Sequence, residues 1–295
     1  MELTVVGHIY RDLRVTKKGV KETIGGAPAY ALSGPTLEAN GTSIVSCIGA
    51  DFPESTLSRL TQSGVDTSGL YQMGPKSTTL ITTIDEEGKK TRSLQSLAPK
   101  ITKEFISPHH LESTIIYFSP VYREIDKSCF TAAASTEAIL ALDLKGILYE
   151  EENNEIQIAS CKDLDFYLGY INVLLLDEIE LSLITEKVTE QDSVDEVLRR
   201  GPFIVILLKG EVGSSIYTHH GKEDIPYVIP SRFRDDAGFV QMYMMGFLLE
   251  FLRTGGNISS SGHFGAVCAS ASMESFGPGS LISRYQVERR LRTLY

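Results

Sequence analysis

Positive charge is scarce in this sequence. Its 28 lysine and arginine residues stand against 38 aspartate and glutamate residues, which gives a formal net charge of -10 at pH 7. Proteins dedicated to nucleic acid binding usually carry a basic surface, so the composition disfavours that class. A small anionic substrate stays compatible with this charge, because a few local donors are enough to bind it.

Cysteine and long apolar runs are scarce as well. The four cysteines lie far apart and form no CxxC pair, which favours reduced thiols over a zinc site or a disulfide framework. The first residues, "MELTVVGHIY", lack the basic segment that begins a signal peptide. No apolar run is long enough to span a membrane. We therefore expect a soluble cytoplasmic protein that has neither a membrane nor a nucleic acid as its partner.

Common catalytic signatures are missing too. The chain has no GxxxxGK[ST], no GxGxxG after a strand, no HExxH and no GxSxG, so it is not a P-loop protein. The six histidines include two adjacent pairs, His109–His110 and His219–His220. Adjacent residues of a strand point to opposite faces, so neither pair is expected to be a metal site.

Short β-rich apolar runs are present throughout the chain and alternate with helix-like stretches. The runs are LTVVGHI, TSIVSCIG, TTLITTI, STIIYFS, AILALDL, INVLLLD, FIVILLKG and SSIYT. The helix-like stretches include APAYALSGPTLEA, ESTLSRLTQSG, SVDEVLRR and most of the chain from residue 237 onward. This alternation predicts an α/β fold with a parallel sheet covered on both faces. Ligands of open α/β sheets bind just outside the carboxyl ends of the strands.

Two regions depart from the alternation. Residues 10–24 alternate loosely and turn near Gly19, and residues 67–96 pair TSGLYQM with TTLITTIDEEGKKTRSL, with a turn at DEEGKK. Both regions are predicted to be β-hairpins that stand apart from the main core and form a lid. The acidic stretch EEENNE at residues 150–155 is expected to be a short loop.

Four strand ends carry glycines or acids. They are VVGHIYRD with Gly7 and Asp12, GGAPAYAL with Gly25 and Gly26, LLLDEIEL with Asp177 and Glu180, and LLKGEVG with Lys209, Gly210 and Gly213. The last is followed by DDAG, which opens the helix-like run that contains Gln241. Each feature alone has a plain explanation, because glycines favour turns and acids at strand ends cap helices. Their order and spacing together carry more information.

In this order the motifs resemble those of the ribokinase, or PfkB-type, carbohydrate kinase family, from Val5 to about Gly277. GGAPAYAL resembles the Gly-Gly signature, LLLDEIEL the Asn-x-x-Glu segment and DDAGFVQMYMMGF the Asp-Thr-x-Gly-Ala-Gly-Asp segment. The resemblance implies one ribokinase-like three-layer α/β/α domain over residues 1–295, with a mostly parallel central sheet and a small β lid. It also implies ATP-dependent transfer of a phosphoryl group to a hydroxyl of a sugar, polyol or nucleoside.

The same resemblance implies roles on the acceptor side. Asp12, Gly25 and Gly26 would hold the acceptor. Tyr30 stands where the family has an asparagine that contacts substrate. Gly238 would open the helix whose N–H groups hold the transferring phosphoryl group.

It implies further roles for the nucleotide and the metal. The residues expected near ATP are Lys209, Gly210, Gly213 and Ala266. Asp177 and Glu180 would organise Mg²⁺ indirectly, through water or phosphate.

The catalytic segment departs from the family pattern. Gly-Ala-Gly-Asp becomes Gly238-Phe239-Val240-Gln241, so an amide replaces the acid that accepts the proton of the attacking hydroxyl. Glutamine can orient a hydroxyl, but it has no basic pair near neutral pH. Val240 is a poor fit for a position that needs positive φ or close approach to phosphate.

The departure leaves three functions open. The first is a kinase, with Asp235 or Asp236 as candidates for a replacement base; the alternative role of Asp235 is to cap or brace the turn. The second is an inactive relative that binds a sugar or nucleotide and serves in regulation. The third is a structural protein that forms a homodimer through the free strand edges of the lid.

Overall fold

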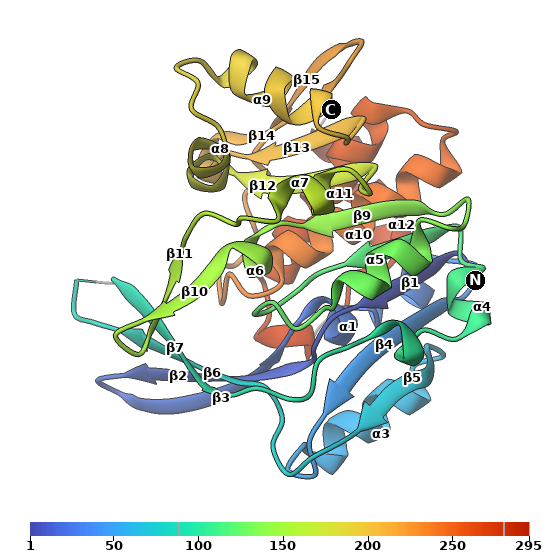
Figure 1. Ribbon diagram of the computed structural model, residues 1–295. Coiled ribbons are helices and arrows are strands. Elements are labelled where there is room, and N and C mark those ends of the chain that lie inside the picture. Colours follow the sequence, from blue (N-terminus) through green and yellow to red (C-terminus); the bar gives the residue numbers. More distant parts are fainter. Residues whose placement is uncertain (88, 280, 295) are drawn as a thin grey trace.

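The computed structural model describes residues 1–87, 89–279 and 281–294 and is built around one large sheet (Figure 1). Within these residues the sheet has nine strands, most of them parallel. In spatial order they are β15 (Gly221–Pro226), β14 (Gly213–Thr218), β13 (Ile204–Leu208), β12 (Val173–Asp177), β9 (Ile139–Asp143), β8 (Ile115–Phe118), β1 (Leu3–Val6), β4 (Thr42–Ile48) and β5 (Asp66–Gln72). β14 and β15 pair antiparallel with their neighbours at one side of the sheet.

Helices cover both faces of this sheet. One face carries α1 (Ala27–Tyr30), α2 (Ser33–Thr36), α3 (Glu54–Gln62), α10 (Phe239–Arg253), α11 (Ile258–Ser272) and α12 (Arg284–Leu294). The other carries α4 (Pro108–Leu111), α5 (Lys127–Ala133), α6 (Lys145–Leu148), α7 (Leu164–Leu168), α8 (Glu178–Ile184) and α9 (Glu190–Arg199). Short 3₁₀ turns are η1 (Lys103–Phe105), η2 (Gly210–Val212) and η3 (Gly277–Gly279). The three-layer α/β/α fold is therefore confirmed.

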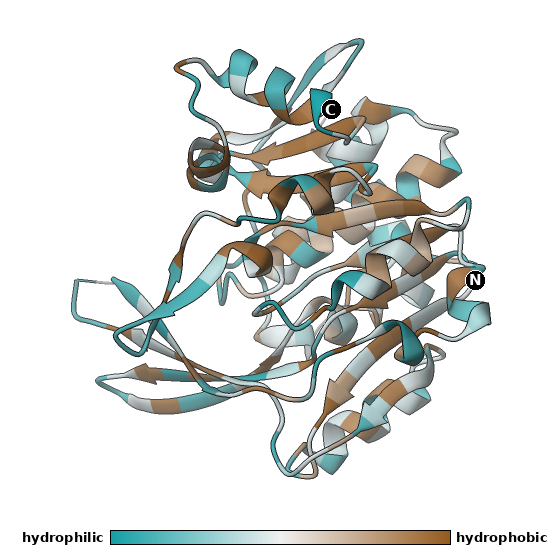
Figure 2. Ribbon diagram, in the orientation of Figure 1, coloured by the Kyte–Doolittle hydropathy of each residue, from teal (hydrophilic) through white to brown (hydrophobic). Residues whose placement is uncertain are grey.

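The central strands are almost entirely apolar because each of them contributes to two cores. In β12, Val173 and Leu175 belong to the core that includes α10 and α11. Leu174 and Leu176 belong to the core that includes α8 and α9. Neighbouring side chains of a strand point to opposite faces, so a strand covered on both faces needs an uninterrupted apolar run. Figure 2 shows the result as brown central strands beside a paler, more hydrophilic lid.

A second sheet, here called the lid, stands apart from the large one at the lower left of Figure 1. Its spatial order is β3 (Gly19–Gly25), β2 (Tyr10–Thr16), β6 (Thr79–Ile84) and β7 (Lys90–Ser96). The hairpin expected at residues 10–24 is β2 with β3. The pairing expected for residues 67–72 is wrong, because these residues belong to β5, which lies parallel to β4 in the large sheet. Instead β6 pairs with β7.

Two points about the lid stay open. Gly88, within the predicted DEEGKK turn, lies outside the described residues. A homodimer formed through the lid stays a prediction.

Other local expectations have mixed outcomes. The apolar runs predicted as strands are confirmed as β1, β4, β6, β8, β9, β12, β13 and β14. The single helix expected over residues 27–39 is divided into α1 and α2, since Pro35 has no N–H with which to continue it. None of the helices in the described ranges is long and apolar enough to cross a membrane.

The acidic loop expected at residues 150–155 is wrong. β10 (Tyr149–Glu152) and β11 (Glu155–Ile158) form an antiparallel hairpin there. Its turn residues Asn153 and Asn154 have φ of 55° and 63°. Asparagine tolerates the left-handed conformation that a tight hairpin turn requires, and the hairpin packs against β7 of the lid.

Candidate active site

Asp12 on β2 is a buried carboxylate whose oxygens are both engaged. Thr82 on the neighbouring strand β6 donates its hydroxyl to Oδ1 at 2.8 Å. Arg14 donates Nε–H to Oδ2 at 2.9 Å. Asp12 and Arg14 lie two positions apart in a strand and so share one face. Asp12, which the sequence predicts to bind the acceptor, is therefore already held by an ion pair and a hydrogen bond within the lid.

Arg14 also links the lid to the turn before α10. Its guanidinium contacts the buried carboxylate of Asp235, and it lies 3.8 Å from Asp236. Lys90 of β7 makes a second link, since its ammonium contacts Asp236. Burial alone would raise the pKa of Asp236, but Lys90 and Arg14 lower it below its usual value. Both acids named as replacement bases are thus held by cations of the lid.

The two acids differ in how far their oxygens are used. Asp235 is 2% exposed, and its Oδ1 also accepts the backbone N–H of Ala237 at 3.1 Å. Its Oδ2 has no hydrogen-bond partner in the described part of the chain. Asp236 is exposed at the surface. Asp235 therefore keeps one buried acceptor oxygen without a protein partner, whereas Asp236 is open to solvent.

Gly238 is the N-cap of α10 and has a left-handed backbone, with φ 83°. A Cβ at this position would overlap the ring of Tyr30 on α1. Glycine is therefore required twice, by the turn and by the close approach of the ring. Val240 and Gln241 follow in the first turn of α10 and are partly exposed. The N-terminus of this helix is an anion site in principle, and the Tyr30 ring packs directly against its first residue.

A second tyrosine packs against the first of the paired glycines, and the backbone carbonyl of His8 lies against the second. A Cβ on Gly25 would overlap the ring of Tyr10, and Gly26 has φ 93° at the N-cap of α1. Burial raises the pKa of Tyr10 and of Tyr30. The hydroxyl of Tyr30 is buried and finds no partner among the residues described. Asp12, Arg14, Tyr10, Tyr30, Gly25, Asp235 and Gly238 are called the acceptor cluster below.

A second group of charges lies at the carboxyl ends of β9 and β12. Lys145 contacts Asp177 at 2.9 Å and Glu180 at 3.2 Å. Asp177 caps α8 by accepting the N–H of Glu180 at 2.8 Å, and Glu180 accepts the N–H of Asp177 at 3.0 Å. Asp143, at the end of β9, accepts from the hydroxyl of Ser119 at 3.4 Å. Asp143, Lys145, Asp177 and Glu180 are called the carboxylate cluster.

Burial sets the electrostatics of this carboxylate cluster. It raises the pKa of Asp143 to about 6 and that of Glu180 to about 8. For Asp177 burial acts in the same direction, but Lys145 and the N–H of Glu180 outweigh it and lower the pKa. Neighbouring carboxylates with pKa values pushed apart are typical of functional sites. Three carboxylates suit a hard cation such as Mg²⁺, although the Lys145 ammonium already contacts two of them.

The residues expected near the nucleotide lie after β13. The ammonium of Lys209 contacts Glu190 at the start of α9, at 2.7 Å, rather than standing free. Gly210 and Gly213 have φ of 55° and 118°, and a Cβ on Gly213 would overlap the carbonyl of Ile225. Ala266 is buried in α11, in the core beside α10. Lys209, Gly210 and Gly213 thus lie just beyond the carboxyl end of β13.

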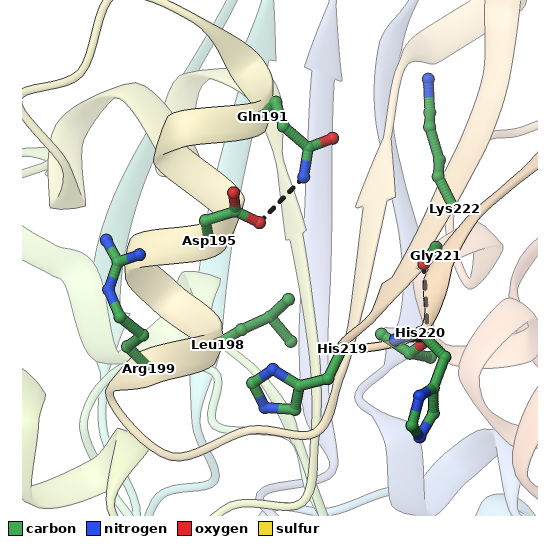
Figure 3. Close-up of a pocket in the computed structure, with 9 residues that line it drawn as sticks. Gln191, Asp195, Leu198, Arg199, His219, His220, Gly221 and Lys222 are labelled. Atoms are coloured by element: carbon green, nitrogen blue, oxygen red, sulfur yellow. Dashed lines mark hydrogen bonds between the residues drawn. The ribbon is translucent and has the colours of Figure 1, made fainter.

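A separate cavity of about 400 Å³ lies between α9 and the β14–β15 turn (Figure 3). Its lining includes Asp195, Arg199, His219 and Lys222. The β14–β15 turn follows Thr218, which pairs with the first residue of β13. The cavity is therefore centred toward the amino end of β13, whereas the predicted site lies at the carboxyl ends of the strands. None of the predicted site residues line the cavity.

Sequence reasoning missed three residues of the two clusters that bear charge. Arg14 follows Asp12 by two positions, so strand periodicity alone puts them on one face. Asp143 ends the apolar run AILALDL, and Lys145 comes two residues later. These three residues could be seen in the sequence, but the residues with which Arg14 and Lys145 form ion pairs are distant in the chain.

A profile of the pfkB family carbohydrate kinases matches residues 2–284, and the chain belongs to this family. Among curated proteins it is 23% identical, over 256 residues, to the cytidine kinase of Thermococcus kodakarensis, covering 86% of this chain and 89% of that protein. It is 24% identical, over 267 residues, to a nucleoside kinase of Methanothermobacter thermautotrophicus, covering 88% and 81%.

Solved structures resemble the chain over almost its whole length. The nucleoside kinase of Methanocaldococcus jannaschii superposes with a TM-score of 0.81 at 23% identity, covering 99% of each chain. A pyrophosphate-dependent kinase in the ribokinase family, complexed with a pyrophosphate analog and myo-inositol, superposes with a TM-score of 0.80 at 18% identity, covering 97% of this chain and 99% of that one. The ribokinase-like fold expected from the sequence is confirmed.

Proposed function

We propose that this chain transfers a phosphoryl group from ATP to a hydroxyl of a nucleoside, sugar or polyol, at a low rate. The observation that carries the proposal is the convergence of Asp12 and the Gly25–Gly26 loop, at the base of the lid, with the Gly238 turn. Arg14 bridges the first and last of these through contacts with Asp12 and Asp235. Family membership supports phosphoryl transfer as the reaction.

Nucleosides are the first acceptors to consider. The curated relatives are named cytidine kinase and nucleoside kinase. Tyr10 and Tyr30 line the two glycine sites with aromatic rings, and such rings suit the flat face of a base. For either ring to stack on an acceptor, it must leave the glycine against which it packs. Acceptor binding would therefore compete with the packing of these tyrosines.

On the donor side, the proposal assigns phosphates and Mg²⁺ to the region between the two clusters. Asp177 and Glu180 would hold the metal through water or phosphate, and Lys145 would add positive charge for the phosphates. When bound, Mg²⁺ would neutralise charge that develops on the transferring group. Lys209, Gly210, Gly213 and Ala266 would border the nucleotide, and Lys209 would have to leave Glu190 to reach a phosphate.

The low rate follows from residue 241. Gln241 can accept a hydrogen bond from the attacking hydroxyl, but it cannot take the proton. Phosphoryl transfer depends mainly on positioning and charge stabilisation, so turnover survives without a base at a cost of about 10²–10⁴-fold. Asp235 is the better of the two candidate substitutes because one of its oxygens is free. Its ion pair with Arg14 weakens it as a base.

One observation favours a second function, a catalytically inactive binding protein. The Tyr30 ring packs against Gly238, where the phosphoryl group would meet the helix N-terminus. If the ring never moves, the fold could keep a nucleotide or sugar site without transfer.

The test is a search for phosphorylated product by mass spectrometry, with the intact chain and Mg²⁺. Cytidine, adenosine, ribose and myo-inositol serve as acceptors, each with ATP and, in parallel, pyrophosphate. We expect product from at least one acceptor, and at least tenfold less from an Asp12→Asn variant that remains folded. No product from any pairing would overturn the kinase proposal. Thermal stabilisation by a ligand without turnover would then support the binding protein, because a ligand bound to the native state alone raises stability.

A further inference from the structure

Two histidines and an aspartate meet at the edge of the large sheet opposite the lid. Asp66 is the first residue of the outermost strand, β5. His109 and His110 lie in the short helix α4, at the right of Figure 1. Each of the three offers a ligand atom that lies within 4.8 Å of the other two. The expectation that this histidine pair cannot form a metal site rested on a strand, and the structure has a helix there.

The helical backbone brings the two imidazoles together instead of separating them. Their ring centroids are 4.0 Å apart. The Nε2 atom of His109 lies 2.9 Å from Oδ2 of Asp66 and 3.2 Å from the hydroxyl of Ser68. Gly69 makes room for the second ring, since a Cβ there would lie 2.8 Å from Cε1 of His110.

His110 supplies an independent sign of a missing ligand. Its side chain is 1% exposed, and its Nε2 atom has no hydrogen-bond partner among the residues that the structure describes. Buried polar atoms are rarely left unpaired, and a bound ion is one of the ordinary partners of an atom that lacks a protein one. The ring is held in place by Ser107, whose hydroxyl lies 2.8 Å from Nδ1 of both histidines.

Ser107 can perform the orienting role that metal-binding histidines require. Such histidines donate the N–H of the nitrogen that does not bind metal to a neighbouring acceptor, which fixes the tautomer. A hydroxyl oxygen has two lone pairs and can accept from both rings. The backbone N–H of Ser107 also approaches Nδ1 of His110, at 3.2 Å, and this weaker contact would be given up. On metal binding each neutral imidazole would exchange its Nε2 proton, by way of solvent, for one on Nδ1, so that Nε2 is free to bind the ion and no net proton is gained or lost.

We propose that Asp66, His109 and His110 bind a divalent transition-metal ion of the Zn²⁺ class, with a fourth position open to water. Two imidazoles and a carboxylate are a donor set that suits Zn²⁺ rather than Mg²⁺. Ligand atoms about 2.0–2.1 Å from a tetrahedral ion are about 3.3 Å apart, so the three side chains would have to draw together from separations of up to 4.8 Å. The ion would fasten the outermost strand to the segment that leads into β8.

The chain contains its own control for this proposal. His219 and His220 are also adjacent, but they lie in the β14–β15 turn, and Figure 3 shows their rings pointing in different directions. Both are exposed. Among the described residues, this pair belongs to no group of three metal-binding side chains whose ligand atoms lie within 4.8 Å of one another. The two pairs therefore have the same composition and different geometry.

The experiment is a titration of the metal-free full chain with Co²⁺, followed by visible absorption, and then displacement by Zn²⁺. Excess Mg²⁺ is present so that the carboxylate cluster does not contribute. We expect one equivalent of Co²⁺ to bind, with the spectrum of a tetrahedral site that contains nitrogen. Asp66→Asn and His109→Ala, both at positions that are not fully buried, should each weaken binding at least tenfold. A variant carrying both His219→Ala and His220→Ala should bind as the wild type does.

The proposal is overturned if the wild type binds no Co²⁺ saturably, or if either Asp66→Asn or His109→Ala leaves the affinity unchanged. It is also overturned if the variant at His219 and His220 loses binding to the same degree. None of these outcomes depends on phosphoryl transfer, so the result is independent of the proposed function.

Discussion

The acceptor cluster and the carboxylate cluster depart from the family pattern to different extents. In the carboxylate cluster, Asp177 and Glu180 stand in the expected places and are supported by Lys145. In the acceptor cluster, an arginine of the lid holds the acid turn, and a tyrosine ring covers Gly238. The contrast teaches that the carboxylate cluster retains the glutamate of the family segment and has an aspartate in place of its asparagine, whereas the acceptor cluster is filled and paired by the protein's own side chains.

The largest expected effect on stability comes from removing the charge of Arg14. Arg14→Gln would leave the buried carboxylates of Asp12 and Asp235 without their cation. Breaking a buried pair on one side costs about 3–5 kcal/mol, and we expect a loss of free energy of unfolding toward that range, measured by urea denaturation. The matched control is Lys17→Gln, because Lys17 pairs with Glu86 and both side chains are exposed, and such surface pairs contribute about 0–1 kcal/mol. Equal losses of free energy of unfolding in the two variants would contradict the claim that Arg14 forms a stabilising buried ion pair.

Next in size is the packing of Tyr30 on Gly238. Gly238→Ala should cost about 2–4 kcal/mol, since it adds overlap with a buried ring to the penalty of a left-handed backbone. Gly255→Ala is the control: its φ is 64°, and a Cβ there would meet nothing within 4 Å. It should cost about 1–2 kcal/mol, the backbone penalty alone. Thermal and urea unfolding measure both, and similar values would mean that the ring does not press on the turn.

A smaller effect, on the pH dependence of stability, is expected from Asp143 of the carboxylate cluster. Burial raises the pKa of Asp143 to about 6, so the fold favours the neutral carboxyl. The stabilisation of the fold by the neutral Asp143 carboxyl is present at low pH and is lost as pH rises through its pKa of about 6. Asp143→Asn has no such dependence, so its stability relative to wild type should improve by about 1–3 kcal/mol between pH 4 and pH 8, at about 1.4 kcal/mol per pKa unit. Urea unfolding across this range is the measurement, with the exposed Glu152→Gln as a flat control.

The sequence alone predicts most of the strands of the large sheet, because the pattern of apolar residues that marks a strand lies within the strand itself. The uninterrupted run INVLLLD indicates a strand buried on both faces, and β12 is such a strand. The placement of residues 67–72 failed because partner choice is set by the neighbouring strand β4, which no local pattern encodes. Likewise Gln241 was visible in the sequence, but the Tyr30 ring over Gly238 joins residues about two hundred positions apart and only folding reveals it.

The most direct test of the account is the rate of product formation after Gln241→Asp. We expect that the missing acid at position 241 limits turnover, and that the remaining residues of the acceptor cluster can still position an acceptor. Restoring an acid should therefore raise turnover by about 10²–10⁴-fold, with whichever acceptor and donor the wild type uses. Gln191→Asp, a glutamine in the first turn of α9, should change nothing. An unchanged rate in a folded Gln241→Asp variant would contradict the account and indicate that the filled acceptor cluster, not the missing acid, prevents transfer.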